Sequence, residues 1–462
     1  MSTPKAEEGR SAGQRKITLG LNPPSNSGDE EYLCRAVAWL SWKPSGEIGE
    51  NPAGTHRIRS MGDQEETRPS KKARASLGSG GLTAFALRLG KQLAEGDGNV
   101  AFSPLSVYTT LGLVAAGARG ETLDEILAVL GASSPDDVAD FVRSLAADPS
   151  GSAGPLITYA YGVFHQEDME LTPAYCNTAA ESYKAEIRAV DFAKGDPEKI
   201  REEINKWAEA ETNNLISEIL PEDSLNHLSR FVLTNAIYFK GVWENHFPET
   251  LTENREFHRL GGAAVDVPFM TFGPGDRSLF LSYHKEFKVL KLPYKTGEAS
   301  AAPQARYSMC VFLPGKRDGL RAMVDALAAG GSVLDHVPKY PSNVRKVLLP
   351  KFKLSFFCRL AEVLKSLGLV DAFSGGADLS GLVKKSSCDM CLDEVYHKAV
   401  VEVNEEGTKA AACTAVVARM MCAMVTSSKE FVADHPFAFY IVEEVSGAVV
   451  FAGHVLDPST SQ

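Results

Sequence analysis

Apolar residues recur at helical spacing where the sequence first departs from a polar, Gly-, Pro- and Ser-rich leader. Five of them lie three or four positions apart, which places them on one stripe of an α-helix. They are Leu82, Phe85, Ala86, Leu89 and Leu93. The pattern starts near Gly80, so we expect a disordered N-terminal extension over residues 1–79 and a folded domain over residues 80–459.

Capping signals predict the next helices. In the run N-V-A-F-S-P-L-S, a short strand precedes Ser103, which we expect to cap a helix with Pro104 at its first position. Thr122 and Glu125 have the spacing of a capping box, and Gly131 ends the short apolar run that follows.

Strand patterns dominate the later part of the chain. A last long helix is expected over residues 197–220, with Ile200, Ile204 and Trp207 on one face. Strand-like runs follow at residues 230–240, 287–292, 307–313 and 346–356. Because helices come first and strands later, without a repeating βαβ order, the pattern indicates an α+β fold.

A strand with an abrupt end begins at Val400. Val401 and Val403 alternate with polar neighbours, as in a half-buried edge strand. Glu405-Glu406-Gly407 breaks this pattern, and Gly407 can adopt backbone angles that other residues avoid.

A run of small residues follows from Thr408 to Ala415, interrupted only by Lys409. At strand spacing one face carries Thr408, Ala410, Ala412 and Thr414. Such a face can pass between two strands without clashing, or remain a solvated loop. An Ala-rich helix is the alternative, since alanine is the best helix former.

Composition narrows the function classes. The chain has 462 residues with 44% hydrophobic and 23% charged residues, which are globular values. Its net charge of -11 argues against nucleic acid as a partner. No apolar run approaches the roughly 18 residues of a membrane helix, and the first residues lack the apolar core of a secretory signal.

The cysteines suggest a reducing compartment. All eight are scattered: Cys34, Cys176, Cys310, Cys358, Cys388, Cys391, Cys413 and Cys422. They form no small disulfide framework, and the pair Cys388 and Cys391 lacks the further ligands that zinc requires, so we expect no metal and no cofactor. No Asn-x-Ser/Thr site occurs. We therefore expect the protein in the cytosol, with extracellular presence without a signal left open.

A short basic cluster lies in the leader at residues 68–74. It indicates either nuclear import or a solvated charge run, and the second interpretation is the more common for such clusters.

Motifs for an enzyme are missing: there is no G-x-S-x-G, H-E-x-x-H or P-loop sequence. We therefore do not expect an enzyme.

Longer strings of residues identify a family. The segment H-K-A-V-V-E-V-N-E-E-G-T-K-A-A-A-C-T-A, residues 397–415, resembles the hinge of an inhibitory serpin. Further segments at 99–106, 204–212, 231–243, 434–441 and 447–455 resemble other serpin motifs, so that the likeness covers residues 80–458. The strings A-A-G-A-R-G-E-T-L-D and F-V-A-D-H-P-F are most similar to those of plant serpins.

The resemblance implies a fold and a set of site residues. The fold is a cluster of helices packed on three β-sheets, with an exposed reactive-centre loop at about residues 405–429. The hinge positions are Glu406, Gly407, Thr408, Ala410, Ala412 and Thr414. The shutter and breach positions beneath the central sheet are Ser103, Ser106, Asn235, Trp243 and His397. Taken singly, each polar member can equally be an ordinary cap, turn or hydrogen-bonded core residue.

The implied function is suicide inhibition of a serine-type endopeptidase. A protease attacks the loop and forms an acyl-enzyme, and insertion of the cleaved loop into the central sheet then traps the covalent complex. We expect a monomer with no nucleic acid or membrane partner. The alternative is a non-inhibitory serpin that binds or stores, but such a protein is expected to carry bulky residues or proline on the small face of the hinge, and this chain has none.

The reactive bond follows from aligning Gly407 with the hinge glycine of the family, which places it between Met421 and Cys422. Methionine suits a chymotrypsin-like or elastase-like pocket and some cysteine proteases. Arg419–Met420 offers trypsin-like enzymes another bond. Family members usually carry serine or glycine where this chain has Cys422. Oxidation of Met421 or capping of Cys422 would make the bond redox-sensitive, although both sulfurs can equally be incidental.

Overall fold

The computed structural model describes residues 71–145, 155–296, 305–330, 332–384, 390–408 and 429–460, all within one unit of the chain, Thr67–Gln462. Several predicted positions lie outside the described residues: Ala410, Ala412, Thr414, Arg419, Met420, Met421 and Cys422, together with Cys34, Cys388, Cys413 and residues 1–70. Their assignments stay predictions.

Eight α-helices occur among the described residues. They are α1 (Lys71–Leu93), α2 (Pro104–Gly117), α3 (Gly120–Leu130), α4 (Pro135–Leu145), α5 (Pro173–Tyr183), α6 (Pro197–Glu211), α7 (Leu320–Gly330) and α8 (Ala361–Ser366), with short 3-10 turns at Glu249–Leu251, Leu334–His336 and Asp371–Phe373. All but one of the residues of helix α2 are buried, the polar Ser106 and Thr110 included, as expected for a helix enclosed on every side.

The strands form two hydrogen-bonded sheets. The six-stranded sheet has the order β11 (Phe352–Arg359), β12 (Tyr396–Val403), β4 (Phe231–Val242), β2 (Leu156–Gln166) and β3 (Glu186–Val190), with β13 (Gly407–Thr408) paired to β4. The ten-stranded sheet has the order β1 (Val100–Phe102), β16 (Val449–Val455), β15 (Phe437–Glu443), β9 (Tyr307–Pro314), β8 (Phe287–Pro293), β7 (Arg277–Tyr283), β10 (Ser342–Pro350), β6 (Ala264–Met270) and β5 (Glu253–His258), with β14 (Lys429–Val432) paired to β10.

The expected α+β class is confirmed. Three sheets were expected, and β10 is the reason that two form. It pairs with β7, with β6 and with β14, which joins two groups of strands into one network.

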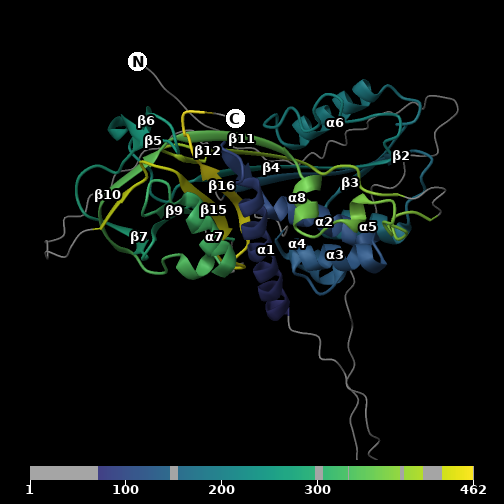
Figure 1. The fold of residues 1–462 in the computed structure, drawn as a ribbon, viewed down its shortest axis with the longest axis horizontal. Helices are drawn as coiled ribbons and strands as arrows, with labels where there is room; N and C mark the ends of the chain where they lie inside the picture. The colour runs from purple at the N-terminus through teal and green to yellow at the C-terminus, as the bar shows by residue number, and fades with distance from the viewer. Residues whose placement is uncertain are drawn as a thin grey trace, which may run out of the picture. The chain divides into compact units, whose positions relative to one another are not determined.

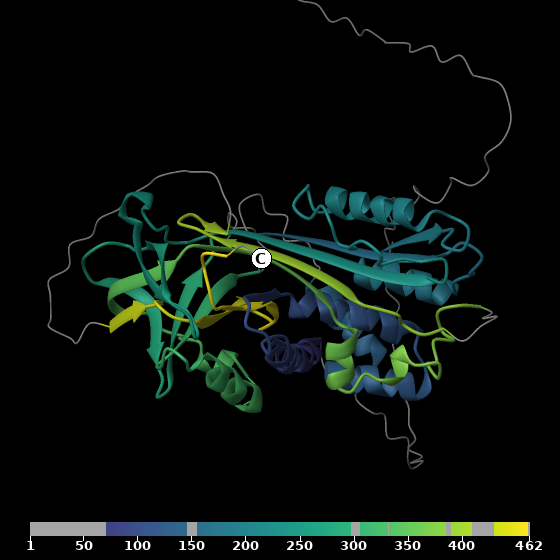
Figure 2. The same cartoon turned by 45° about the horizontal axis from the view of Figure 1, so that its top comes forward.

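Helices cover both faces of the six-stranded sheet. Helix α6 lies along one face, and α2 to α5 lie on the other (Figures 1 and 2). Ile200, Ile204 and Trp207 of α6 belong to one buried cluster with Phe164 of β2 and Ala236 of β4. Strand β4 is therefore buried on both faces along most of its length.

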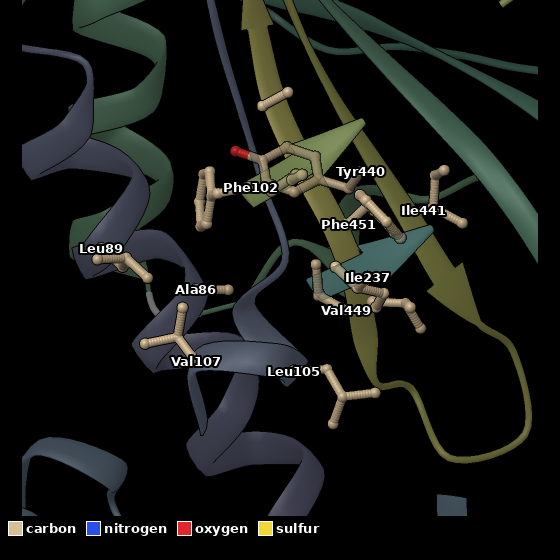
Figure 3. Close-up of a cluster of buried hydrophobic side chains, with 14 of the residues drawn as sticks. Ala86, Leu89, Phe102, Leu105, Val107, Ile237, Tyr440, Ile441, Val449 and Phe451 are labelled. Carbon is tan, nitrogen blue, oxygen red and sulfur yellow. The ribbon is translucent and has the colours of Figure 1, made fainter. Parts of the chain in front are cut away.

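The main core lies between helices α1 and α2 and strands β15 and β16. Figure 3 shows side chains from these elements pointing toward one another, including Leu89, Leu105, Tyr440 and Phe451. Ile237 of β4 reaches the same cluster from the six-stranded sheet, so one core supports both sheets.

Several boundaries differ from the expected ones. Helix α1 begins at Lys71, so the expected start near Gly80 falls inside it; the glycines at 78, 80 and 81 interrupted the apolar pattern but not the helix. Helix α6 ends at Glu211, before the expected end at 220. The run 346–356 is two strands, because Pro350 ends β10 and β11 starts at Phe352.

The helix caps were predicted in part correctly. Ser103 caps α2 by accepting a hydrogen bond from the Ser106 amide at 3.1 Å, and Gly131 ends α3 with φ of 63°. The prediction that Thr122 and Glu125 form a capping box is wrong. Helix α3 starts at Gly120, and both side chains instead bind the distant segment 370–378.

Candidate functional site: two diverging strands and the polar groups beneath them

The central feature of the site is the pairing of β4 with β12. These parallel strands pair only from Thr234–Tyr396 to Tyr238–Val400. On its other side β4 pairs with β2 over ten residues, down to Lys240. Beyond Val400, β12 pairs with β11 alone. The predicted half-buried alternation of β12 is correct, but β12 is an internal strand whose edge is open only at its end.

A tight turn at the end of β12 sends the chain back along β4. The Asn404 Oδ1 accepts hydrogen bonds from the amides of Glu406 and Gly407, both at 3.1 Å. Strand β13 then pairs antiparallel with β4, with Gly407 opposite Val242 and Thr408 opposite Gly241. Gly407 and Thr408, the first residue of the expected small-residue run, are therefore already paired with β4, where β4 and β12 have diverged.

Only glycine fits at position 407. Its φ is +151°, a region that residues with a side chain rarely adopt. A Cβ at this position would overlap the carbonyl oxygen of Gly241 and lie 2.7 Å from the Cα of Val242. The backbone of β13 can approach β4 this closely because position 407 has no side chain.

Trp243 anchors the turn from the end of β4. Its indole Nε1 donates to the Asn404 carbonyl oxygen at 2.9 Å, and its amide donates to the Glu406 carbonyl oxygen at 2.8 Å. The ring stacks on Tyr294 with centroids 4.5 Å apart, and the side chain is 1% exposed. Trp243 thereby holds the turn through both its backbone and its side chain.

An ion pair between a buried carboxylate and a partly exposed lysine ties the same turn to the neighbouring strands. The Glu405 carboxylate lies 2.8 Å from Lys351 Nζ, between β10 and β11, and accepts a hydrogen bond from Thr252 Oγ1 at 2.7 Å. Burial alone would raise the pKa of Glu405, but the hydrogen bonds from Lys351 and Thr252 hold that pKa below its usual value. Removing Lys351 would leave a nearly buried carboxylate without its cation, which is unfavourable.

A second group of polar side chains lies beneath the sheet, where β4 and β12 still pair. We call Ser103, Ser106, Thr110, Asn235 and His397 the polar cluster. Asn235 of β4 is its centre: its Oδ1 accepts from Ser106 Oγ at 2.8 Å and from His397 Nδ1 at 2.9 Å. Its Nδ2 donates to Thr110 Oγ1 at 2.6 Å. Asn235 and His397 are also direct partners in the strand register, so the cluster joins α2 to both strands.

The hydrogen bonds determine the protonation state of His397. The Ser103 backbone amide donates to His397 Nε2 at 3.0 Å, so this nitrogen carries no proton and Nδ1 is the donor to Asn235. Burial lowers the pKa of His397 to about 3, because a charged imidazole would lose its hydration. The neutral ring is therefore part of the folded structure.

Stability is expected to fall as the pH falls below 6.5. Burial also lowers the pKa of His454, to about 4. Below pH 6.5 the unfolded chain binds protons on His397 and His454 that the folded chain does not, so the free energy of unfolding decreases with acidification. Each histidine contributes a slope of about 1.4 kcal/mol per pH unit between its two pKa values.

Urea unfolding between pH 7.5 and 5 measures this slope. His397→Gln is expected to remove about one histidine's share of this slope, while Asn254→Gln, an exposed substitution in β5 that removes no titratable group, leaves it unchanged. A slope that His397→Gln does not reduce would contradict a neutral, buried imidazole in the folded protein.

The predicted site residues thus fall into two groups. Ser103, Ser106, Asn235 and His397 lie together, and Trp243 lies at the far end of β4 with Glu406, Gly407 and Thr408. Sequence reasoning did not find Thr110, Thr252 or Lys351, because polar residues of these types carry no local signal of a distant partner. Asn404 could have been found, since asparagine before Glu-Glu-Gly is a common turn residue.

Among the residues that the structure describes, no helix combines the length and the apolar character needed to span a membrane. No group of three or more His, Cys, Asp or Glu side chains in this part of the chain is arranged to hold a metal ion.

Comparisons with known proteins agree with this architecture. The family model described as "Serpin (serine protease inhibitor)" matches residues 81–458. The chain is 46% identical to Serpin-Z2A of Oryza sativa subsp. japonica, over 83% of this chain and 98% of that protein. It is 39% identical to Serpin-ZX of Arabidopsis thaliana, over 78% of this chain and 93% of that protein.

A solved structure shows the same fold. Arabidopsis AtSerpin1 in its native stressed conformation aligns with a TM-score of 0.75 and 35% identity, covering 85% of this chain and all of that one.

Proposed function

The chain belongs to the serpin family, whose members are generally protease inhibitors, and we propose that it inhibits serine-type endopeptidases as a suicide substrate. The protease attacks a bond of the loop at residues 405–429 and becomes acylated. The cleaved loop then inserts between β4 and β12 while the protease is still attached. The product is a one-to-one covalent complex of an inhibitor monomer, which is consumed rather than turned over.

One observation carries this proposal. Strand β13 occupies the position that the first residues of an inserted strand would take. Gly407 and Thr408 pair with Val242 and Gly241 of β4, beyond the point where β12 stops pairing with β4. Continuation of β13 along β4 would extend the sheet by one strand, antiparallel to β4. The polar cluster lies in the path of such an inserted strand. Asn235 of β4 and His397 of β12 are paired with each other, so this pairing must break before a new strand can lie between β4 and β12.

The free energy available is large enough to deform a protease. Fourteen residues separate Gly407 from Met421, about 46 Å of extended chain. A dozen new ladder hydrogen bonds at a net value of about 1 kcal/mol each supply about 10 kcal/mol. A displacement of about 1 Å in a catalytic site can slow catalysis a hundredfold, so deacylation can be strongly slowed.

The chemistry of the reactive bond indicates the target class. We propose cleavage between Met421 and Cys422 by chymotrypsin-like or elastase-like proteases, with some cysteine proteases as further targets. A trypsin-like protease is expected to cut between Arg419 and Met420, which shortens the inserting strand by two residues and lowers the yield of complex.

The decisive experiment incubates the protein with chymotrypsin, elastase and trypsin. We expect a complex that survives boiling in detergent. The residue before the cleaved bond stays esterified to the protease, so mass spectrometry should find Cys422 or Met420 as the new N-terminus of the released C-terminal peptide. A protease with its catalytic serine replaced by alanine is the control, since it cannot be acylated. Cleavage with no complex by any protease would reject inhibition and favour a binding or storage role; cleavage at other bonds would reject the assigned register.

We also propose that the protein works inside the cell, in the cytosol, with entry into the nucleus as an open alternative. The described cysteines Cys176, Cys310, Cys358 and Cys391 form no disulfide with one another, as expected in a reducing compartment. A fluorescent tag after Gln462 should report these compartments. Recovery of the tagged protein only from secretory fractions would contradict the proposal, and unchanged nuclear signal after alanine replacement of Lys71, Lys72 and Arg74 would assign no import role to the basic cluster.

A further inference from the structure

Two lysines flank a half-exposed tyrosine on the ten-stranded sheet. Tyr283 ends β7, and its side chain is 48% exposed. The Nζ atoms of Lys288 in β8 and Lys429 in β14 lie 4.9 and 5.6 Å from the centre of its ring. Such distances allow attraction between an ammonium group and the ring face. We call these three residues the lysine–tyrosine cluster.

The cluster is built into the backbone around it. The Tyr283 hydroxyl donates to the Glu430 carbonyl oxygen at 2.8 Å and accepts from the Glu430 amide at 2.7 Å. Lys429 Nζ donates to the Leu281 carbonyl oxygen at 3.0 Å, and Lys288 Nζ donates to the Glu430 carbonyl oxygen at 3.3 Å. These contacts hold both ammonium groups beside the ring without neutralising them.

The charge of this surface is opposite to that of the whole chain. Neither Lys288 nor Lys429 forms an ion pair with any other described residue. The turn between β7 and β8 contributes the positive charge of Lys285, and β10, the partner of β14, contributes those of Arg345 and Lys346. The negative charges in the same segments are Glu286 and Glu430. Lys285 Nζ lies 3.9 Å from the Glu286 carboxylate. A chain with a net charge of -11 therefore presents a local excess of positive charge here.

This surface adjoins one end of the loop. Lys429 starts β14, which is paired with β10 (β7 and β10 are labelled in Figure 1). Eight residues separate it from Met421, no more than about 26 Å of extended chain. A protease that attacks the Met421 bond is itself wider than this distance. Its surface around the substrate cleft therefore comes within reach of the lysine–tyrosine cluster.

We propose that the lysine–tyrosine cluster is a second docking surface for the target protease, and that it selects proteases with carboxylates around the active-site cleft. This inference rests on the proposed function. The positive charge raises the rate of encounter with an acidic surface, and the exposed edge of Tyr283 supplies apolar contact area. Specificity then depends on the charge of the protease surface as well as on the residue before the cleaved bond.

The test compares an anionic with a cationic chymotrypsin, which share one cleavage specificity. The measured quantity is the second-order rate at which the intact chain is consumed, whether it ends as complex or as cleaved protein. In Lys288→Gln and in the double variant Lys288→Gln/Lys429→Gln, we expect a fall of about five- to tenfold with the anionic enzyme at low salt, shrinking in 1 M salt. With the cationic enzyme the rate should stay the same or rise. Lys206→Gln, an exposed lysine of α6, is the matched control.

Equal rates for Lys288→Gln and the unsubstituted protein with both enzymes would overturn the inference, and so would an equal loss with both. The proposed function is read separately, from the ratio of complex to cleaved chain. Loss of docking with that ratio unchanged supports the inference. Consumption without any complex rejects inhibition, while the consumption rates still decide whether the cluster docks the protease.

Discussion

Thr408→Arg is expected to turn the protein from an inhibitor into a substrate. In an inserted strand, position 408 shares one face with positions 410, 412 and 414, all of which carry small residues. Position 408 is also the partner of Gly241 in β4, where a Cβ would lie 2.5 Å from the Tyr294 ring, so the sheet has little free space there. Burying an unpaired guanidinium group costs several kcal/mol.

The consequence is kinetic. A barrier raised by several kcal/mol slows insertion more than a hundredfold, and hydrolysis of the acyl-enzyme then occurs first. We expect the ratio of covalent complex to cleaved chain to fall at least tenfold, measured by densitometry after incubation with chymotrypsin, while the rate of cleavage stays the same. Lys409→Arg is the control, because the same side chain stands on the other face. Undiminished complex formation by Thr408→Arg would reject insertion of this face.

Asn235→Ala is expected to destabilise the protein by about 3–6 kcal/mol. The buried Ser106 Oγ and His397 Nδ1 lose their acceptor. Thr110 Oγ1 loses a donor but keeps its hydrogen bond to the Ser106 carbonyl oxygen at 3.1 Å. Each buried polar group left without a hydrogen bond costs about 1–3 kcal/mol. The hydrogen bond between Asn235 and His397 joins β4 to β12, so its loss should also weaken the association of these two strands.

Urea unfolding measures this change, with Asn254→Ala in the exposed part of β5 as a control that should change stability by less than about 0.5 kcal/mol. If Asn235→Ala does not fold, Ser106→Ala removes a single bond of the cluster and should cost about 1–2 kcal/mol. A change below 1 kcal/mol in Asn235→Ala would show that these hydrogen bonds contribute little net stability.

Local patterns determined much of the architecture. The alternation of Val401 and Val403 predicted a half-buried strand, and Ser103 and Gly131 were correctly placed at helix ends. These predictions succeed because side-chain periodicity and capping depend on neighbours within a few residues. The α+β class followed from the order of such elements, and the long motif strings identified the serpin family before any contact was known.

Tertiary structure alone decided which distant residues meet. Thr122 and Glu125 satisfy a local capping rule, yet they bind the segment 370–378, because hydrogen-bond partners from another part of the fold replaced the local ones. The place where β12 leaves β4, and the pairing of Gly407 with Val242, are matters of register. Register depends on how strands far apart in sequence align, and a period-2 pattern is the same for every alignment shifted by two residues. For that reason the sequence could predict a small-residue strand after Gly407, while only the fold shows where Gly407 and Thr408 already pair.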